Sequence, residues 1–134
     1  MEKNRLVLDS GALSVVAGEK GRLRIAIRQA LAQSTDVVVP TVVVAESTTG
    51  HVGHDARVNR VLKRMLIAPL DEPLARQAAR LRHATRSRRG DTIDAIVVAT
   101  ADCVPGSQLL TGDTSDVRPL AAVANKTVVV SINA

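Results

Sequence analysis

Short, unbroken apolar runs are the feature of this sequence that most constrains its fold. They include Leu6-Val7-Leu8, Val37-Val38-Val39 and Leu109-Leu110, and none of them alternates apolar with polar residues. Runs of this kind are typical of strands that are covered on both faces, as in parallel sheets. The segments between them carry apolar residues at helical spacing, for example in residues 22–33. Strands that alternate with helices predict an α/β sandwich with a mostly parallel sheet.

The same patterns predict the order of the elements, with one segment left open. Asp71-Glu72-Pro73 combines a capping acid, an early acid and a first-turn proline, which is a strong helix start. Thr41 could cap a helix, whereas the β-branched run Val42-Val43-Val44 favours a strand. The predicted strands cover residues 5–9, 36–39, 65–70, 108–111 and 127–132. The predicted helices cover residues 12–17, 22–33, 55–64, 71–90 and 92–103, with a turn and a short helix within 113–124.

Length and composition suit one domain over residues 1–134. A chain of 134 residues with 46% hydrophobic residues can build a single core. It has no Phe, Tyr or Trp, so it lacks the base-stacking platform of many single-strand binders. The single cysteine, Cys103, excludes an internal disulfide framework. No signal-peptide core and no run of membrane-spanning length is present, so we expect a cytoplasmic protein without membrane association.

The basic balance of the chain points to a polyanionic partner. The net charge is +5, with 14 Arg against 4 Lys, and an arginine can bind phosphate through two parallel hydrogen bonds. A high-GC coding sequence would also enrich Arg and deplete aromatic residues. Arg86, Arg88 and Arg89 near the end of the 71–90 helix are candidate RNA contacts. The alternative is a solvated helix face, with cations favoured by the helix dipole.

Four carboxylates stand at the ends of apolar runs. Asp9 and Asp113 follow predicted strands, while Glu46 and Asp94 lie near helix starts. In an open parallel sheet these positions share the carboxyl edge, where ligands bind. Carboxylates about 4 Å apart repel by roughly 4 kcal/mol per pair at an effective dielectric near 20, which a cation would offset. Oxygen-only ligands favour Mg²⁺ or Mn²⁺ over Zn²⁺.

These acids and the residues around them resemble the PIN-domain family, in particular VapC-type ribonuclease toxins. The matching segments are Leu6-Val7-Leu8-Asp9-Ser10, Pro40-Thr41-Val42-Val43-Val44-Ala45-Glu46, Asp94-Ala95-Ile96-Val97-Val98-Ala99-Thr100-Ala101 and Leu110-Thr111-Gly112-Asp113. The resemblance implies a three-layer sandwich with a five-stranded parallel sheet, and it places Glu46 on a helix.

The resemblance also implies the roles of the site residues. Asp9, Glu46, Asp94 and Asp113 match the metal-site acids, and Asp116 matches a further acid that helps to hold a second ion or a water. Ser10 and Thr111 would line the site with hydroxyls. Many members carry a small hydroxyl residue where this chain has Gly11, so Ser10 or a backbone N–H would take that part.

The implied activity is hydrolysis of RNA by a Mg²⁺- or Mn²⁺-dependent endoribonuclease that leaves a 5′-phosphate and a 3′-hydroxyl. The implied partners are RNA, a cognate antitoxin that covers the active-site groove, and a second copy of the chain in a homodimer. A catalytically silent PIN-like module that binds RNA or protein is the alternative function. Two other acid-bearing folds fit poorly. A dehalogenase-type phosphatase needs a second acid two residues after the first, where this chain has Gly11. A phosphoacceptor domain needs an acidic pair directly after the first strand and a lysine after the last one. In this chain Asp9 is followed by Ser10-Gly11-Ala12, and Ile132 by Asn133-Ala134.

Each candidate residue also has a structural explanation. Asp91 and Asp94 could cap a helix, and Asp91 is the better cap. Asp113 and Asp116 could be turn residues. His51 and His54 have the spacing of a zinc pair, but no further ligand lies nearby in sequence.

Overall fold

The structure is a computed structural model that describes residues 5–18, 21–33, 36–85, 92–104, 106–112, 114–124 and 128–131. Its sheet has five parallel strands in the order β3-β2-β1-β4-β5, which confirms the predicted fold class. β1 is central and pairs with β2 and β4. The strands are β1 (Arg5–Leu8), β2 (Asp36–Pro40), β3 (Leu66–Ala68), β4 (Gln108–Thr111) and β5 (Val128–Ser131).

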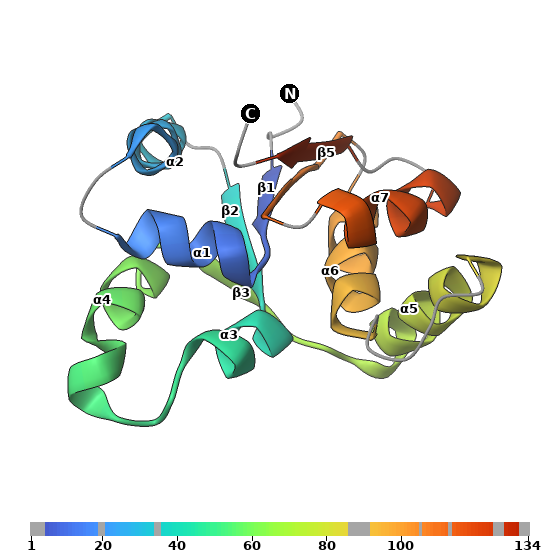
Figure 1. Cartoon of the computed structure of the whole chain (residues 1–134), viewed down its shortest axis with the longest axis horizontal. Helices are drawn as coiled ribbons and strands as arrows, with labels where there is room; N and C mark the ends of the chain where they lie inside the picture. Colours follow the sequence, from blue (N-terminus) through green and yellow to red (C-terminus); the bar gives the residue numbers. More distant parts are fainter. Residues whose placement is uncertain are drawn as a thin grey trace.

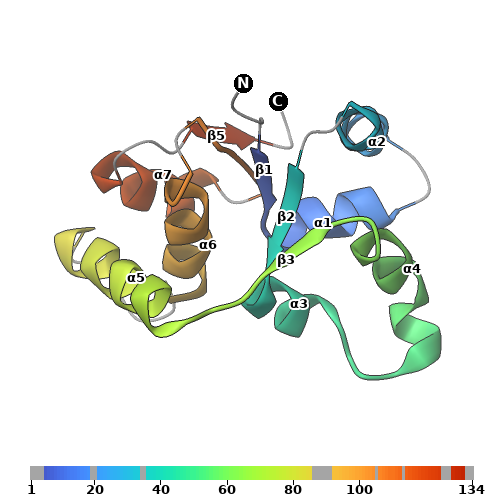
Figure 2. The same ribbon diagram turned by 180° about the vertical axis from the view of Figure 1, so that it is seen from behind.

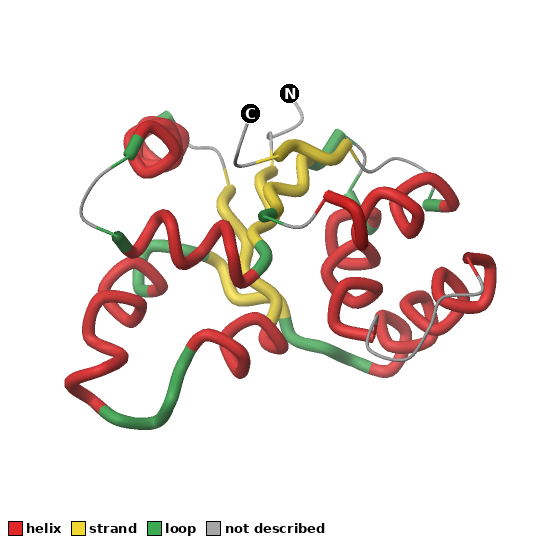
Figure 3. The backbone as a smooth tube through the Cα atoms, in the orientation of Figure 1, coloured by secondary structure: helices red, strands yellow, loops and turns green. Residues whose placement is uncertain are grey.

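Helices cover both faces of the sheet. Figures 1 and 2 show α1, α2 and α4 on one side and α5, α6 and α7 on the other, with α3 at one end of the strands. The tube in Figure 3 shows the same sandwich of helices around the strands. The first group comprises α1 (Ser10–Ala17), α2 (Arg22–Ala32), α3 (Thr41–Ser47) and α4 (Val52–Leu62). The second comprises α5 (Glu72–Thr85), α6 (Thr92–Asp102) and α7 (Thr114–Val123).

Mainly aliphatic side chains fill the described core, which contains no aromatic residue. Its largest fully buried members include Leu8, Leu13, Ile27, Leu109 and Leu120. Every residue of α6 from Ala95 to Ala101 is buried, as its nearly all-apolar sequence predicts. Each fully buried Val, Leu or Ile contributes roughly 1.5–3 kcal/mol relative to its exposed state. Among the described residues, no helix is both long and apolar enough to cross a bilayer.

Residues 42–44, for which the sequence left helix and strand undecided, are helical. In α3 the side chain of Val43 is fully buried, while Val42 and Val44 pack against the core. Thr41 is the first residue of this helix rather than its cap, and its hydroxyl accepts a hydrogen bond from the N–H of Leu70 at 3.2 Å. Core packing therefore outweighs the strand preference of three consecutive valines.

Two other helices begin earlier than the sequence predicts. Ser10 and Gly11, which precede the predicted 12–17 helix, lie in the first turn of α1, because Asp9 caps that helix. Helix α4 begins at Val52, since Nδ1 of His51 accepts the N–H of His54 at 3.2 Å. Histidine is a weak capping signal, which is why the sequence placed this start three residues later.

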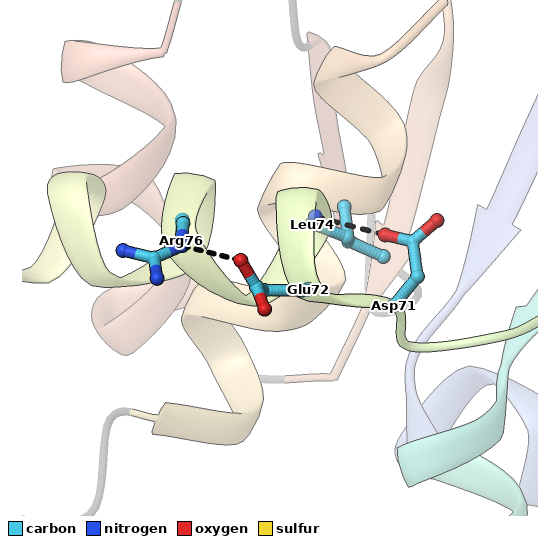
Figure 4. Close-up of polar contacts among 4 residues, drawn as sticks. All are labelled: Asp71, Glu72, Leu74 and Arg76. Atoms are coloured by element: carbon cyan, nitrogen blue, oxygen red, sulfur yellow. Dashed lines mark hydrogen bonds and ion pairs between the residues drawn. The ribbon is translucent and has the colours of Figure 1, made fainter.

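The start of α5 is as predicted (Figure 4). Oδ1 of Asp71 accepts the N–H of Leu74 at 2.9 Å, and Arg76 pairs with Glu72 at 3.0 Å one helical turn away. Both ion-pair partners are largely exposed. The pair therefore adds only a few tenths of a kcal/mol to stability.

Candidate active site

The centre of the sheet contains a topological switch point. The chain leaves β1 toward β2 over one face, and it reaches β4 and β5 over the other face. The carboxyl ends of β1 and β4 are therefore neighbours from which the connections diverge, and ligands bind at such points in open α/β sheets. The N–H of Asp9 donates to the carbonyl of Leu110 at 3.2 Å. This bond joins the end of β1 to the end of β4.

Asp9 is held rigidly at this switch point. Its side chain is largely buried, and the residue is 8% exposed. Oδ1 accepts the N–H of Ala12 at 2.8 Å, so the carboxylate caps α1. Oδ2 accepts no hydrogen bond from the part of the chain that the structure describes. One oxygen thus fixes the side chain, and the other is placed for a ligand.

Three of the four predicted acids line one cavity. Asp9 follows β1, Glu46 comes from α3 and Asp94 from the first turn of α6, and all three face a cavity of about 430 Å³. Helix α3, at the end of the strands, packs against α6, and Glu46 and Asp94 line the cavity from these two helices. The described lining carries no cationic side chain. Its other members are Ser10, Gly11, Ile93, Val97 and Gly112.

The donor set of this cavity fits a hard divalent cation. Carboxylates and a hydroxyl are the oxygen ligands that Mg²⁺ and Mn²⁺ take. Within the described residues, no three His, Cys, Asp or Glu side chains lie close enough together to hold a metal ion. Asp113, the fourth predicted acid, lies outside the described residues, but its neighbour Gly112 lines the cavity.

The remaining predicted site residues take several positions. Ser10 lines the acidic cavity, whereas Thr111 is fully buried at the end of β4. Asp116 is exposed in the first turn of α7 and is not among the described lining residues. Asp91 and the three candidate RNA contacts, Arg86, Arg88 and Arg89, lie outside the described residues.

Gly11 lies where α1 meets the β4–α7 turn. A Cβ added there would be 3.5 Å from Oδ1 of Asp9 and 3.5 Å from both N and Cα of Gly112. These are ordinary van der Waals distances. The missing family hydroxyl at this position is therefore not explained by lack of space for a Cβ.

Glu46 also borders a second cavity, which the sequence did not predict. It is lined by residues of α1, α3 and α4, among them Ser14, Ser47, His54 and Arg57. The rings of His51 and His54 have centroids 4.2 Å apart. Because Nδ1 of His51 serves as the helix cap, the pair has a structural role that needs no zinc.

Asp55 anchors the loop between α3 and α4. Its carboxylate accepts the N–H of Thr49 at 2.8 Å, the hydroxyl of Thr49 at 2.9 Å and the N–H of Gly50 at 2.8 Å. The Thr49 N–H is the main reason that the pKa of Asp55 lies below its ordinary value, and burial opposes this shift. Asp55, Val58 and Leu62 share the inner face of α4, and this helical spacing could have identified Asp55 as buried.

The fold and the site place this chain in the class of parallel α/β sandwiches that carry carboxylates at the central switch point. Residues 6–121 match the family model described as the PIN domain. The chain therefore belongs to the PIN domain family, as the sequence motifs predicted. No curated protein is significantly similar to it in sequence.

Solved structures share this fold at low sequence identity. VapBC2 from Rickettsia felis, bound to a DNA fragment from its promoter, is 11% identical with a TM-score of 0.70, over 95% of this chain and 98% of that one. DNA-bound VapBC from Salmonella typhimurium is 16% identical with a TM-score of 0.69, over 98% of both chains. FitAcB from Neisseria gonorrhoeae is 20% identical with a TM-score of 0.60, over 92% of this chain and 95% of that one.

Proposed function

We propose that this chain is a metal-dependent endoribonuclease and the toxin of a toxin–antitoxin pair. The observation that carries the proposal is the cavity at the switch point, where Asp9, Glu46 and Asp94 converge from three elements. Membership of the PIN domain family supports a nuclease. The VapBC complexes among the similar structures support the pairing with an antitoxin.

The acids of the cavity would hold Mg²⁺ or Mn²⁺. Asp9, Glu46, Asp94 and Asp113 are the proposed ligands, with Asp116 assisting a second ion. Such a cation would supply Lewis-acid chemistry, activating a water and offsetting the charge of the scissile phosphate. The chain itself supplies orientation: the Ala12 N–H fixes Oδ1 of Asp9, and Ser10 lines the cavity beside the acids. The hydroxyl of Thr111, buried at the end of β4, is proposed to support the site from behind. The expected products carry a 5′-phosphate and a 3′-hydroxyl.

The proposed partners follow from the same assignment. They are RNA as the substrate, a cognate antitoxin that covers the active-site groove, and a second copy of the chain in a homodimer. Arg86, Arg88 and Arg89 are proposed to contact the RNA backbone. The proposed place of action is the cytoplasm, where the RNA substrates are.

The experiment that tests the activity is cleavage of total cellular RNA, with mapping of the new ends. Purified protein is incubated in Mg²⁺, in Mn²⁺ and in EDTA, beside Asp9→Asn and Asp94→Asn variants. We expect cutting at a few sites with either metal, and no cutting in EDTA or by either variant. Asn at position 9 keeps a carbonyl oxygen for the Ala12 N–H, so α1 stays capped.

Glu72→Gln is the matched control, because Glu72 is an exposed acid on α5, outside the cavity lining. A readout without RNA is the melting temperature, which Mg²⁺ should raise in the wild type and not in Asp9→Asn, since a ligand that binds only the folded state stabilises it. Binding of RNA without cleavage under every condition would instead establish the catalytically silent module.

A further inference from the structure

A second cavity adjoins the acidic one and differs from it in chemistry. It measures about 520 Å³ and lies between α1, the end of α3 and α4. Ser10 and Glu46 line both cavities, so the two share a wall. Beyond that wall the second cavity adds the guanidinium of Arg57 and the imidazole of His54. The described charges of the first cavity are therefore all anionic, whereas the second cavity combines the carboxylate of Glu46 with the cation of Arg57.

The second cavity is rich in hydrogen-bond donors. Its lining carries the hydroxyls of Ser10, Ser14 and Ser47 beside Arg57 and His54. Oγ of Ser47 is buried and has no hydrogen-bond partner among the described residues. A buried hydroxyl without a partner costs roughly 1–3 kcal/mol, so a ligand that accepts its proton would gain from binding there. Phosphate oxygens are acceptors that suit hydroxyl, imidazole and guanidinium donors together.

The walls of this cavity are held in place before any ligand arrives. The His51 ring lies against the His54 ring, with 4.2 Å between centroids, and its Nδ1 binds the N–H of His54. The buried carboxylate of Asp55 ties Thr49 and Gly50 to the first turn of α4. These contacts fix the loop that joins the helix of Glu46 to the helix of Arg57, and hence the spacing of the two cavities.

We infer that the second cavity binds a backbone phosphate of the RNA next to the scissile phosphate, with Arg57, His54 and Ser47 as donors. The inference rests on the proposed ribonuclease function, because it takes the acidic cavity as the place of the scissile phosphate. Phosphates repeat along a single strand, so a strand seated over the acids must place a neighbouring phosphate on one side or the other. The second cavity, to which Arg57 adds a cation, offers that place on the side of α4.

The test compares two arginines of the same helix. Arg57→Gln removes the cation that lines the cavity, whereas Arg60→Gln removes an exposed cation of α4 outside the cavity lining. Gln and Arg have similar helix propensities, so both variants should keep α4. Each substitution is placed in an Asp94→Asn background, in EDTA. Affinity for a short, mixed-sequence single-stranded RNA is then measured over a range of salt concentrations.

We expect Arg57→Gln to weaken RNA binding roughly tenfold, the loss of one charged hydrogen-bonded contact. The slope of log K against log salt should become shallower by roughly 0.7, the value for one phosphate contact on a single strand. Arg60→Gln should change neither quantity. Ser47→Ala should weaken binding without changing the salt slope, because it removes a neutral donor.

Equal salt slopes for Arg57→Gln and Arg60→Gln would overturn the inference. So would unchanged RNA affinity in Arg57→Gln combined with weaker binding of the antitoxin, which would make the cavity a protein-docking site. RNA binding by the parent that is undetectable at low salt would overturn it together with the RNA substrate. Because this test measures binding without catalysis, a failed cleavage experiment and a failed phosphate site give separate results.

Discussion

Asp9 and Asp71 occupy the same local motif, a helix cap after a strand, but their surroundings differ. Each follows a parallel strand, and each caps the next helix through Oδ1, at 2.8 Å to the N–H of Ala12 and at 2.9 Å to the N–H of Leu74 (Figure 4). Asp9 is nearly buried and shares a cavity with two other acids. Asp71 is exposed and lines a cavity of about 560 Å³ that also contains Arg5 and Cys103.

The position of the strand in the sheet explains the difference. Asp9 follows β1, the central strand, where the connections to the two halves of the sheet diverge. Asp71 lies beyond β3, an edge strand with a neighbour on one side only. An acid becomes a candidate ligand when the topology brings other acids to it, and the capping motif alone does not do so. The predictions below test that distinction.

The largest expected effect separates the two acids by activity. Asp9→Asn should lower RNA cleavage by roughly 100-fold or more, because it removes a proposed metal ligand while keeping the helix cap. Asp71→Asn should leave the cleavage rate within about twofold of the wild type, since it changes only an exposed cap. The measurement is the initial rate of cleavage of one mapped RNA site in Mg²⁺. Similar losses in both variants would mean that the contrast lies in folding rather than in the site.

A third acid, Asp55, sharpens the comparison because it reaches back to the preceding loop. Asp55→Asn should destabilise the chain more than the loss of either cap, since it places an amide where the carboxylate accepts three hydrogen bonds. The pKa of Asp55 is lowered in the folded state, so its contribution is present above the ordinary Asp value. It disappears as the pH falls through the lower folded-state pKa.

Urea unfolding of wild type and Asp55→Asn over a range of pH measures this effect. The difference between the two should be constant near neutrality and shrink below a pH of about 4. A difference that stays the same into the acid range would show that the charge of Asp55 adds nothing to stability.

Alanine substitutions compare the two caps by stability. Asp71→Ala should cost about 1 kcal/mol, the usual value of a lost N-cap. Asp9→Ala should cost less in EDTA, because it also removes a negative charge from beside Glu46 and Asp94. With Mg²⁺ present the order should reverse, since Asp9→Ala then forfeits the bound ion. Chemical unfolding of both variants in each buffer measures these stability losses. If Mg²⁺ did not reverse which variant loses more stability, the prediction would be contradicted.

The smallest expected effect is that of Gly11→Ser. The added Cβ meets its neighbours at 3.5 Å, and Ser is a better helix residue than Gly by a few tenths of a kcal/mol. We expect stability within about 0.5 kcal/mol of the wild type and cleavage within about threefold. Thermal unfolding and the same cleavage assay provide the measurement. A large loss of activity with unchanged stability would show that the site needs the backbone at Gly11 uncovered.

Most of the fold could be predicted from sequence because its signals are local. The strands read as apolar runs, and the starts of α5 and α6 carry strong patterns. Residues 42–44 were the exception, since β-branching favours a strand there whereas packing against the core favours a helix. The resemblance to a family decided that segment, and core packing explains it.

The candidate site was predictable only in part. Asp9 and Asp94 could be placed together because parallel topology gathers the ends of strands and the starts of helices at one edge. Glu46 lines the same cavity from the end of the short helix α3, and its predicted place near a helix start was wrong. The cavity with His54 and Arg57 could not be predicted, because it depends on the packing of α1 against α4. That contact joins two helices with no shared sequence pattern. The position of α4 depends in turn on the hydrogen bonds of Asp55 to a loop.

The backbone hydrogen bond from Asp9 to Leu110 has a consequence for folding during synthesis. A ribosome releases β1 well before β4, and domains fold as their chains emerge. Until β4 arrives, β1 has no neighbour on that side, and the wall of the acidic cavity at Gly112 does not exist. A chain that has not yet released β4 therefore lacks the complete acidic cavity.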